Sequence, residues 1–275
     1  MDSQLEPGMP PCVTAVESSS KGPASTPRMD LDASLETGKA MRALKGEDFT
    51  CTLHVPNGPR LSAVADGHGG AAASRHVCQN ARVLHLVAEG LKNESLAAAC
   101  HRAFLKVHEE VRALPGTTAG TTLTVVAMDD AKSELTLANV GDSGALFVGT
   151  SESQVLTASH RLQTNAQERE RMTKLGAVVA QAARPGCGTP YGPLRAWPGG
   201  IVCTRAIGDG DCGDLVSAKV RLSGVCPPLF ALLCTPGPSC LSPTQNLPIT
   251  DPVSSLLLGS PPFVRCSTRR TVGRW

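Results

Sequence analysis

Residues 61–70 read LSAVADGHGG, and AAASRH follows directly behind them. The run of small apolar residues is typical of a buried β-strand, and the glycines after it indicate a tight turn into a helix. A turn needs one or two glycines, but it does not need an acid and an imidazole between them. Asp66, Gly67 and His68 therefore indicate a functional site at the end of this strand.

Three other segments also place carboxylates at turns: KGEDF (45–49), NVGDSG (139–144) and RAIGDGDCGD (205–214). Acids at strand ends supply the oxygen ligands that Mg²⁺ and Mn²⁺ prefer. Within the first motif, Asp66 can bridge two cations, and the carbonyl of Gly67 can approach a cation because glycine lacks a Cβ. His68 is then placed to protonate a leaving oxygen as a general acid.

Each of these segments also has an interpretation without a metal. GDSG alone is typical of a hairpin turn, and KGED alone is typical of a solvated, charged bend. DGHGG can form a glycine-rich anion cradle at a helix N-terminus. GDGDCGD lacks the alternating ligands and the closing Glu of an EF-hand, which argues against a calcium loop.

Composition limits the classes of function. The chain has 275 residues, of which 41% are hydrophobic and 3% aromatic, so it can bury a core of aliphatic side chains. Its net charge of +2 provides no field for nucleic acid or anionic lipid, and no apolar run approaches the length of a membrane span. We expect a monomer that binds neither nucleic acid nor membrane.

The cysteines predict a compartment. The chain contains 11 cysteines but no CxxC spacing, which argues against a zinc site. The N-terminus lacks the basic and apolar regions of a secretory signal. We therefore expect free thiols in a reducing setting, the cytoplasm or the nucleus.

Changes in amino-acid composition and in the pattern of apolar residues along the chain predict three regions. Residues 1–38 are rich in Ser, Pro and Gly and predict a flexible N-terminal tail. Residues 39–218 alternate β-like runs with helical patterns and predict the folded domain. Residues 219–275 contain nine prolines and a single acid, Asp251, and predict a divergent, disordered C-terminal tail.

Within the predicted domain, several elements can be expected. Strands are predicted over 61–66, 121–129, 134–140 and 145–149. One helix is predicted after GHGG, with Val77, Ala81, Leu84 and Ala88 on one face, and another over 94–114 with Asn93 as its cap. Asn165 followed by Glu168 is a capping-box pattern that opens a charged helix ending at Gly176.

In this order, the segments resemble the metal-dependent protein serine/threonine phosphatases of the PP2C type. The resemblance runs from about residue 40 to 218 and includes KGEDF, VADGHGG, GTTLTVV and LANVGDSGALFV. It continues through LTASHRLQTNAQERERMTKLGAVV and GPLRAWPGGIVCTRAIGDGDCG, where it is most similar to the plant and green-lineage branch. Six ordered segments are far more specific than any one of them alone.

The resemblance implies an α+β fold, a four-layer αββα sandwich of two antiparallel β-sheets flanked by helices. It implies two Mn²⁺ or Mg²⁺ ions at one end of the sandwich and a bridging water that attacks a phosphoserine or phosphothreonine of a phosphorylated protein substrate. By the same resemblance, Asp66 and Gly67 are metal ligands, Glu47 acts through water with Asp48 in support, and His68 is the general acid. Asp142 matches an acid that helps to hold a third, weaker ion.

The sequence also departs from the family pattern. The family provides second-metal carboxylates in a DG motif and an Asp-Asn motif after the segment that matches RAIGD, and neither occurs here. The sandwich is therefore expected to be incomplete at its C-terminus, and a catalytically inactive binding or regulatory relative, or a truncated isoform, is the alternative function. Many members bind the substrate phosphate with an arginine where this chain has Ala43, and Arg42 and Lys45 are the nearby substitutes.

Overall fold

The structure is a computed structural model that describes residues 45–129, 131–132, 134–148, 153–225, 232–234 and 258–259. The expected N-terminal tail (1–38) and Arg42 lie outside the described residues, as do most positions after residue 225. Among the helices of the described ranges, none combines the length and the apolar character needed to cross a bilayer.

Short strands and helices alternate along the described chain, as the sequence predicts. The strands are β1 (Asp48–His54), β2 (Arg60–His68), β3 (Gly120–Thr121), β4 (Leu123–Asp129), β5 (Glu134–Val140), β6 (Gly144–Val148), β7 (Ser153–Val155), β8 (Val178–Ala183), β9 (Pro190–Trp197), β10 (Ile207–Gly208), β11 (Arg221–Val225), β12 (Leu232–Cys234) and β13 (Leu258–Gly259). The helices are α1 (Ala72–Cys78), α2 (Arg82–Gly90), α3 (Leu96–Arg112) and α4 (Ala166–Lys174), with 3₁₀ turns η1 (Gln79–Ala81) and η2 (Gly210–Leu215).

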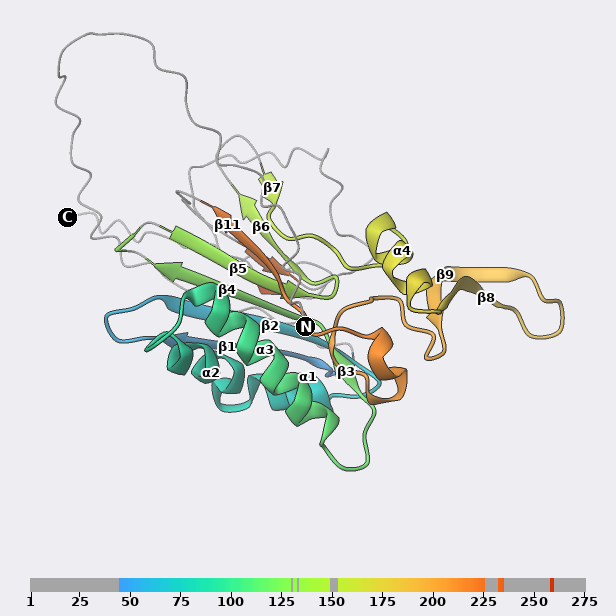
Figure 1. Ribbon diagram of the computed structural model, residues 1–275, viewed down its shortest axis with the longest axis horizontal. Helices are drawn as coiled ribbons and strands as arrows, with labels where there is room; N and C mark the ends of the chain where they lie inside the picture. Colours follow the sequence, from blue (N-terminus) through green and yellow to red (C-terminus); the bar gives the residue numbers. More distant parts are fainter. Residues whose placement is uncertain are drawn as a thin grey trace, which may run out of the picture. The chain divides into compact units, whose positions relative to one another are not determined.

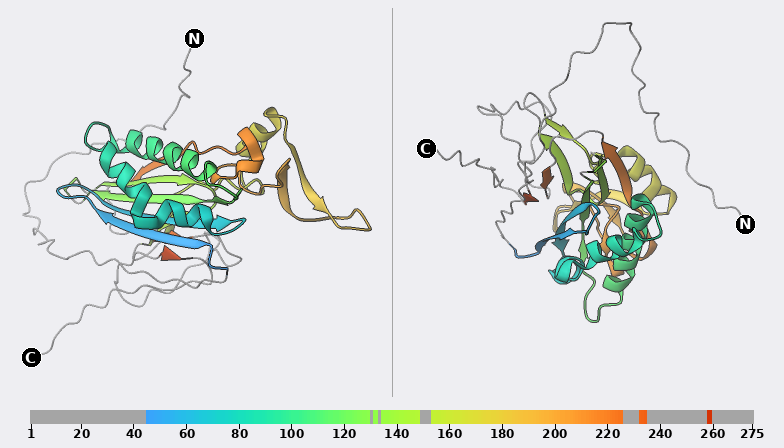
Figure 2. Two further views of the ribbon diagram at one scale, coloured as in Figure 1. Left: turned by 90° about the horizontal axis from the view of Figure 1, so that it is seen from below. Right: turned by 90° about the vertical axis from the view of Figure 1, so that its left-hand side faces the viewer.

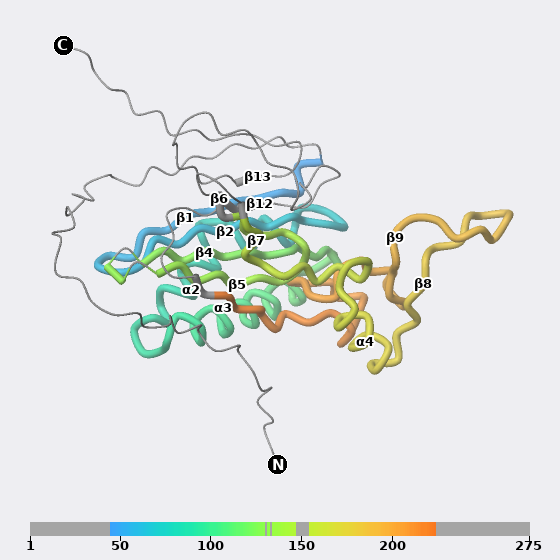
Figure 3. The backbone as a smooth tube through the Cα atoms, turned by 90° about the horizontal axis from the view of Figure 1, so that it is seen from above, coloured from blue at the N-terminus to red at the C-terminus, as the bar shows by residue number. Residues whose placement is uncertain are grey.

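The main sheet is antiparallel and has the strand order β10-β3-β2-β4-β5-β11, with β1 paired to β2. Its long central strands lie side by side in Figure 3. A second sheet has the order β13-β12-β6-β7, and β8 and β9 form a separate hairpin. Consecutive strands pair within β4–β5 and β6–β7, as short connections favour.

Helices α1, α2 and α3 cover one face of the main sheet (Figures 1 and 2). Their buried side chains join those of β2 and β4 in the largest hydrophobic cluster, which includes Leu84, Phe104 and Leu123. The opposite face packs Val126 and Leu137 against Ala145 of β6 in a second cluster. The antiparallel main sheet, with helices on one face and a second sheet on the other, confirms the expected α+β fold.

Two predicted helix features are wrong in detail. The helix expected after GHGG is broken into α1 and α2, because Asn80 and Ala81 adopt left-handed φ values of 50° and 52°. The next helix is capped by Ser95 rather than Asn93, since the Ser95 hydroxyl accepts a hydrogen bond from the Ala98 N–H at 3.3 Å.

The main sheet extends beyond the domain boundary expected at residue 218. Strand β11 pairs with β5 along its whole length, from Arg221 opposite Asn139 to Val225 opposite Leu135. Backbone pairing requires no particular side chains, so a segment without a family motif can still complete a sheet edge. Residues 221–225 therefore belong to the folded unit.

Candidate functional site

Asp66 lies at the end of β2, where β1 and β2 pair residue by residue. The register places Asp48 directly opposite Asp66, so the two carboxyl groups share one end of the strand pair. On the other side, the Asp66 N–H donates to Thr122 Oγ1 at 3.1 Å, and Thr122 N–H donates to the Asp66 carbonyl at 2.9 Å. These bonds fix the backbone that carries the Asp66 side chain.

Gly67 is buried against the residue before β1. Its N–H donates to the Glu47 carbonyl at 3.1 Å, and the Ser74 hydroxyl donates to the same oxygen at 2.5 Å. The Glu47 side chain accepts a hydrogen bond from Gly70 N–H at 3.0 Å, and Lys45 Nζ lies 4.0 Å from it. Glu47 thus ties the glycine-rich turn to the start of β1.

His68 is held by an acid from a distant segment, Asp209 of RAIGDGDCGD. His68 Nε2 lies 2.7 Å from Asp209 Oδ1, although the two residues are 141 positions apart. Strand β3 joins them, because Gly120 pairs with His68 on one side and with Gly208 on the other. A Cβ at Gly120 would collide with both His68 Nε2 and Asp209 Oδ1, so glycine is required there.

Asp209 holds its position at a cost in backbone energy. Its φ of 51° lies in the left-handed region, which non-glycine residues rarely adopt. The carboxylate is buried, while about half of the His68 side chain is exposed to the cleft. Strain of this kind is characteristic of functional sites, where the surrounding structure compensates for it.

These side chains open into a cleft of about 480 Å³. Its lining includes four carboxylates, one imidazole and two guanidinium groups: Asp66, Asp142, Asp209, Asp211, His68, Arg161 and Arg195. Asp142, in the turn after β5, accepts a hydrogen bond from Arg161 Nη1 at 2.6 Å. Among the described residues, Glu47, Asp48 and Lys45 do not line this cleft, although Asp48 faces Asp66 from β1.

Neighbouring carboxylates contribute to the shifts in the pKa values of Asp66 and His68. Burial and the neighbouring carboxylate of Asp48 raise the pKa of Asp66 from 3.8 to about 8, with a further contribution from Asp142. Burial opposes protonation of His68, but the hydrogen bond and charge of Asp209, with the charges of Asp66 and Asp142, raise its pKa above 6.5. A carboxyl group whose anion is so disfavoured needs a cation beside it to ionise fully.

This donor set fits a hard divalent cation. Asp48 shares a side-chain hydrogen bond with Asp66, the charge of Asp142 also acts on Asp66, and carboxylate oxygens are the ligands that such a cation prefers. One trio of described acidic, His or Cys residues has all its donor atoms within 4.8 Å, and it consists of Asp209, Asp211 and Cys212 rather than the predicted ligands. Asp209 in that trio is already engaged by His68.

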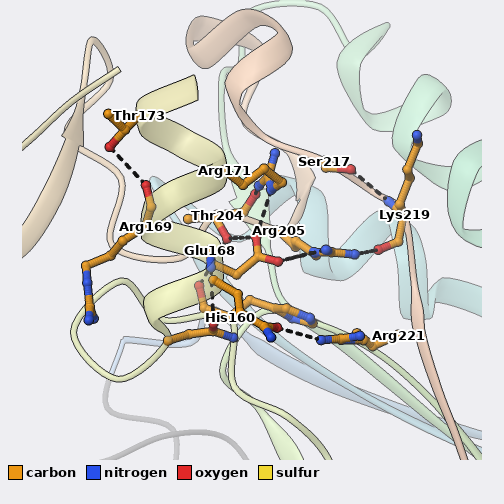
Figure 4. Close-up of polar contacts among 12 residues, drawn as sticks. His160, Glu168, Arg169, Arg171, Thr173, Thr204, Arg205, Ser217, Lys219 and Arg221 are labelled. Atoms are coloured by element: carbon orange, nitrogen blue, oxygen red, sulfur yellow. Dashed lines mark hydrogen bonds and ion pairs between the residues drawn. The ribbon is translucent and has the colours of Figure 1, made fainter. Parts of the chain in front are cut away.

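A buried ionic cluster is centred on Glu168 of α4 (Figure 4). The Glu168 carboxylate accepts hydrogen bonds from Arg205 at 2.7 Å, from Arg171 at 2.9 Å and from the Thr204 hydroxyl at 2.6 Å. The Asn165 side chain caps α4 by accepting from Glu168 N–H, which confirms the predicted cap. The cluster anchors the segment that leads from Thr204 to Asp209.

The structure therefore brings Asp66, His68 and Asp142 into one cleft, with Asp48, Gly67 and Glu47 on its β1 side. Thr122, Gly120 and Arg195 are site residues that sequence reasoning missed. The strand predicted over 121–129 contains Thr122 and stops short of Gly120, and only the pairing of β3 with β2 and β10 shows what Gly120 contacts.

The stacked antiparallel sheets, with helices outside and an acidic cleft at the strand ends, place the chain in the class of α+β sandwich proteins. A family model described as "Protein phosphatase 2C" matches residues 44–226, and the chain belongs to this family.

Similar proteins agree with this assignment and with the plant-like branch. "Probable protein phosphatase 2C 15" of Arabidopsis thaliana is 38% identical over 195 residues, which cover 65% of this chain and 44% of the relative. "Probable protein phosphatase 2C 69" of Oryza sativa subsp. japonica is 35% identical over 195 residues, which cover 65% of this chain and 45% of the relative. The chain thus spans less than half the length of these curated relatives.

Solved structures show the same fold. A sex-determining protein of C. elegans superposes with a TM-score of 0.59 at 23% identity, covering 72% of this chain and 50% of that one. A phosphatase from Toxoplasma gondii superposes with a TM-score of 0.53 at 19% identity, covering 69% of this chain and 66% of that one.

Proposed function

We propose that the protein is a metal-dependent phosphatase that hydrolyses phosphoserine and phosphothreonine in protein substrates. The observation that carries the proposal is the juxtaposition, in one acidic cleft, of Asp66 with the His68–Asp209 pair, whose Nε2 and Oδ1 atoms lie 2.7 Å apart. Membership of the protein phosphatase 2C family supports the reaction class.

Asp66 and the Gly67 carbonyl are the residues we assign to Mn²⁺ or Mg²⁺, with Asp48, Glu47 and Asp142 in support. Divalent cations supply an activated water and stabilise negative charge on the phosphoryl group when they are bound. The second-metal carboxylates that the family resemblance implies have no counterpart in this sequence, so we assign one complete set of ligands around Asp66.

His68 is the group we assign as general acid. The hydrogen bond of its Nε2 to Asp209 Oδ1 stabilises the imidazolium and helps to raise the pKa of His68, which favours the protonated form that a general acid needs. The Nε2 proton is hydrogen-bonded to Asp209, so the proton that passes to the leaving serine or threonine oxygen in the cleft is the one on Nδ1, and the ring is left neutral. Asp209 fixes the ring orientation through Nε2 and stabilises the charged form before the transfer.

The oligomeric state and the compartment of the protein are also proposals. We infer that the protein acts as a monomer. We infer the cytoplasm or the nucleus as its compartment, because the thiols of Cys51, Cys100, Cys187, Cys203 and Cys212 are free, as a reducing compartment allows.

The test is hydrolysis of a phosphothreonine peptide with Mn²⁺ or Mg²⁺, in parallel with calorimetric titration of Mn²⁺. We expect Asp66→Asn to abolish turnover and Mn²⁺ uptake together, while Asp214→Asn, an exposed acid on η2, changes neither. A folded wild-type protein that takes up Mn²⁺ but releases no phosphate is a binding protein, and that result would overturn the enzymatic proposal.

A further inference from the structure

An acidic cleft repels an anionic substrate unless it also carries positive charge. The assignments above give no role to the positively charged side chains of this cleft. Lys45 does not provide that charge, because its side chain is 82% exposed and points to Glu47 outside the cleft. In the part of the chain that the structure describes, the guanidinium groups that line the cleft belong to Arg161 and Arg195.

Both arginines lie on one wall of the cleft, built from three extended backbone segments. Arg161 pairs with Cys203 in an isolated β-bridge, and Leu162 N–H donates to the Val202 carbonyl at 2.9 Å. Ala196 pairs in turn with Ile201 in a second bridge. The segment 201–203 thus lies between Arg161 and the end of β9, which carries Arg195.

The two arginines differ in what neutralises them. Arg161 Nη1 is bound to the Asp142 carboxylate at 2.6 Å, so its charge is compensated within the cleft. Arg195 Nη1 instead donates to the backbone carbonyl of Gly200 at 2.6 Å, and in the described part of the chain it forms an ion pair with no carboxylate. Arg195 therefore presents a fixed and uncompensated positive charge.

The base of the hairpin makes this position rigid. Ala196, next to Arg195, is fully buried in a cluster with Leu162 and Met172. The carbonyl of Gly200 anchors the guanidinium through Nη1, and because a guanidinium has five N–H donors, this bond leaves others for a ligand in the cleft that Arg195 lines. Such a fork matches the oxygens of a phosphate dianion.

We propose that Arg195, supported by Arg161, is the phosphate-binding residue of the cleft and receives the phosphoryl group of the substrate. This proposal rests on the proposed phosphatase function and deepens it, because it assigns recognition of the phosphoryl group to a residue of β9. The ion pair with Asp142 engages Arg161, while Arg195 remains available to the incoming phosphate anion.

The experiment measures binding of inorganic phosphate to the full chain by calorimetry in the presence of Mn²⁺. We expect Arg195→Gln to weaken phosphate binding by about 10- to 100-fold, the value of a charge-assisted hydrogen bond. Arg195→Lys should recover part of the loss, because it keeps the charge without the fork. The affinity for a phosphothreonine peptide should fall by the same factor in Arg195→Gln. The unphosphorylated peptide should show no binding that depends on Arg195.

Arg184→Gln is the matched control, since Arg184 lies in the same hairpin but is exposed and stacks on the Tyr191 ring, 5.8 Å from its centroid. Thermal melts and Mn²⁺ titration establish that each variant is folded and takes up the metal. Unchanged phosphate affinity in Arg195→Gln, or no phosphate binding by the wild type, overturns the inference. Phosphate binding that depends on Arg195, without hydrolysis of the peptide, supports the inference and rejects the enzymatic proposal.

Discussion

At the scale of single residues, two glycines decide whether the cleft can form. Gly120 allows His68 and Asp209 to meet over a strand that has no Cβ at that point. Gly67 allows β2 to approach the residue before β1, where its N–H reaches the Glu47 carbonyl at 3.1 Å. In both cases the position of the acidic groups depends on a neighbouring glycine, which has no Cβ to keep them apart.

Gly67→Ala is expected to disrupt the cleft. An alanine Cβ would lie 2.5 Å from the Glu47 carbonyl oxygen and 2.6 Å from Ser74 Oγ, so β1 and β2 must separate. Overpacking of this kind costs about 2 kcal/mol, and we expect a lower melting temperature and weaker Mn²⁺ binding by calorimetry.

Gly210→Ala is the control, because a Cβ there meets nothing within 4 Å. It should leave both the melt and the Mn²⁺ titration unchanged. Equal melting temperatures for Gly67→Ala and the wild type would show that the close approach of β1 and β2 is not needed.

At the scale of elements, the packing of α4 depends on one buried acid. Glu168 is 5% exposed. Burial acts to raise its pKa, but hydrogen bonds from Arg205 and Thr204, with the charges of Arg205 and Arg171, lower that pKa to about 2. Glu168→Gln leaves those arginines without their partner, and removal of one member of a buried pair costs about 3 kcal/mol. We expect a clear fall in the urea midpoint of unfolding.

The same substitution at Glu170 provides the comparison. Glu170 lies in α4 as well, but its carboxylate is 66% exposed and pairs with Lys174 in solvent. Exposed pairs contribute little, so Glu170→Gln should unfold at the wild-type midpoint. If both variants behaved alike, the buried cluster would not stabilise α4.

His160 gives the fold a predicted pH dependence. Burial, with the nearby charge of Arg205, lowers the pKa of His160 from 6.5 to about 4 in the folded state. The unfolded state therefore binds more protons between these values, so stability is lost as the pH falls through this range. The loss from pH 7 to pH 5 amounts to about 2 kcal/mol.

Urea unfolding at the two pH values measures this loss. The His160→Gln variant lacks the titrating group, and the difference between pH 7 and pH 5 should shrink by about 2 kcal/mol in that variant. An equal pH dependence in the two proteins would place the titration elsewhere.

Local patterns predicted elements well and contacts poorly. Asn165 caps α4 as its sequence position indicates, but the Glu168 side chain turns inward to Arg205 instead of closing a capping box. That choice depends on a residue 37 positions away, which no local pattern contains. The same limit explains why Asp66 and His68 could be predicted from DGH, whereas the contact of Asp209 with His68 required the pairing of β10 with β3.

At the scale of the whole molecule, the match to the protein phosphatase 2C family ends at residue 226, one position after β11. None of the motifs quoted for the family resemblance lies in β11, and the change in composition placed the boundary at residue 218. The family match and the sheet pairing agree that the folded unit continues through Val225.

A pair of shortened chains tests the role of β11. A chain that ends at residue 218 leaves β5 as an unpaired edge, with the backbone groups of residues 135–139 exposed and Leu135 and Leu137 less covered. A chain that ends at residue 225 keeps the strand and differs only by these residues. We expect the shorter chain to melt at a lower temperature, to aggregate, and to exchange the β5 amide protons that face β11 much faster. If both chains melted alike with equal protection of β5, the pairing of β11 would contribute nothing to the sheet.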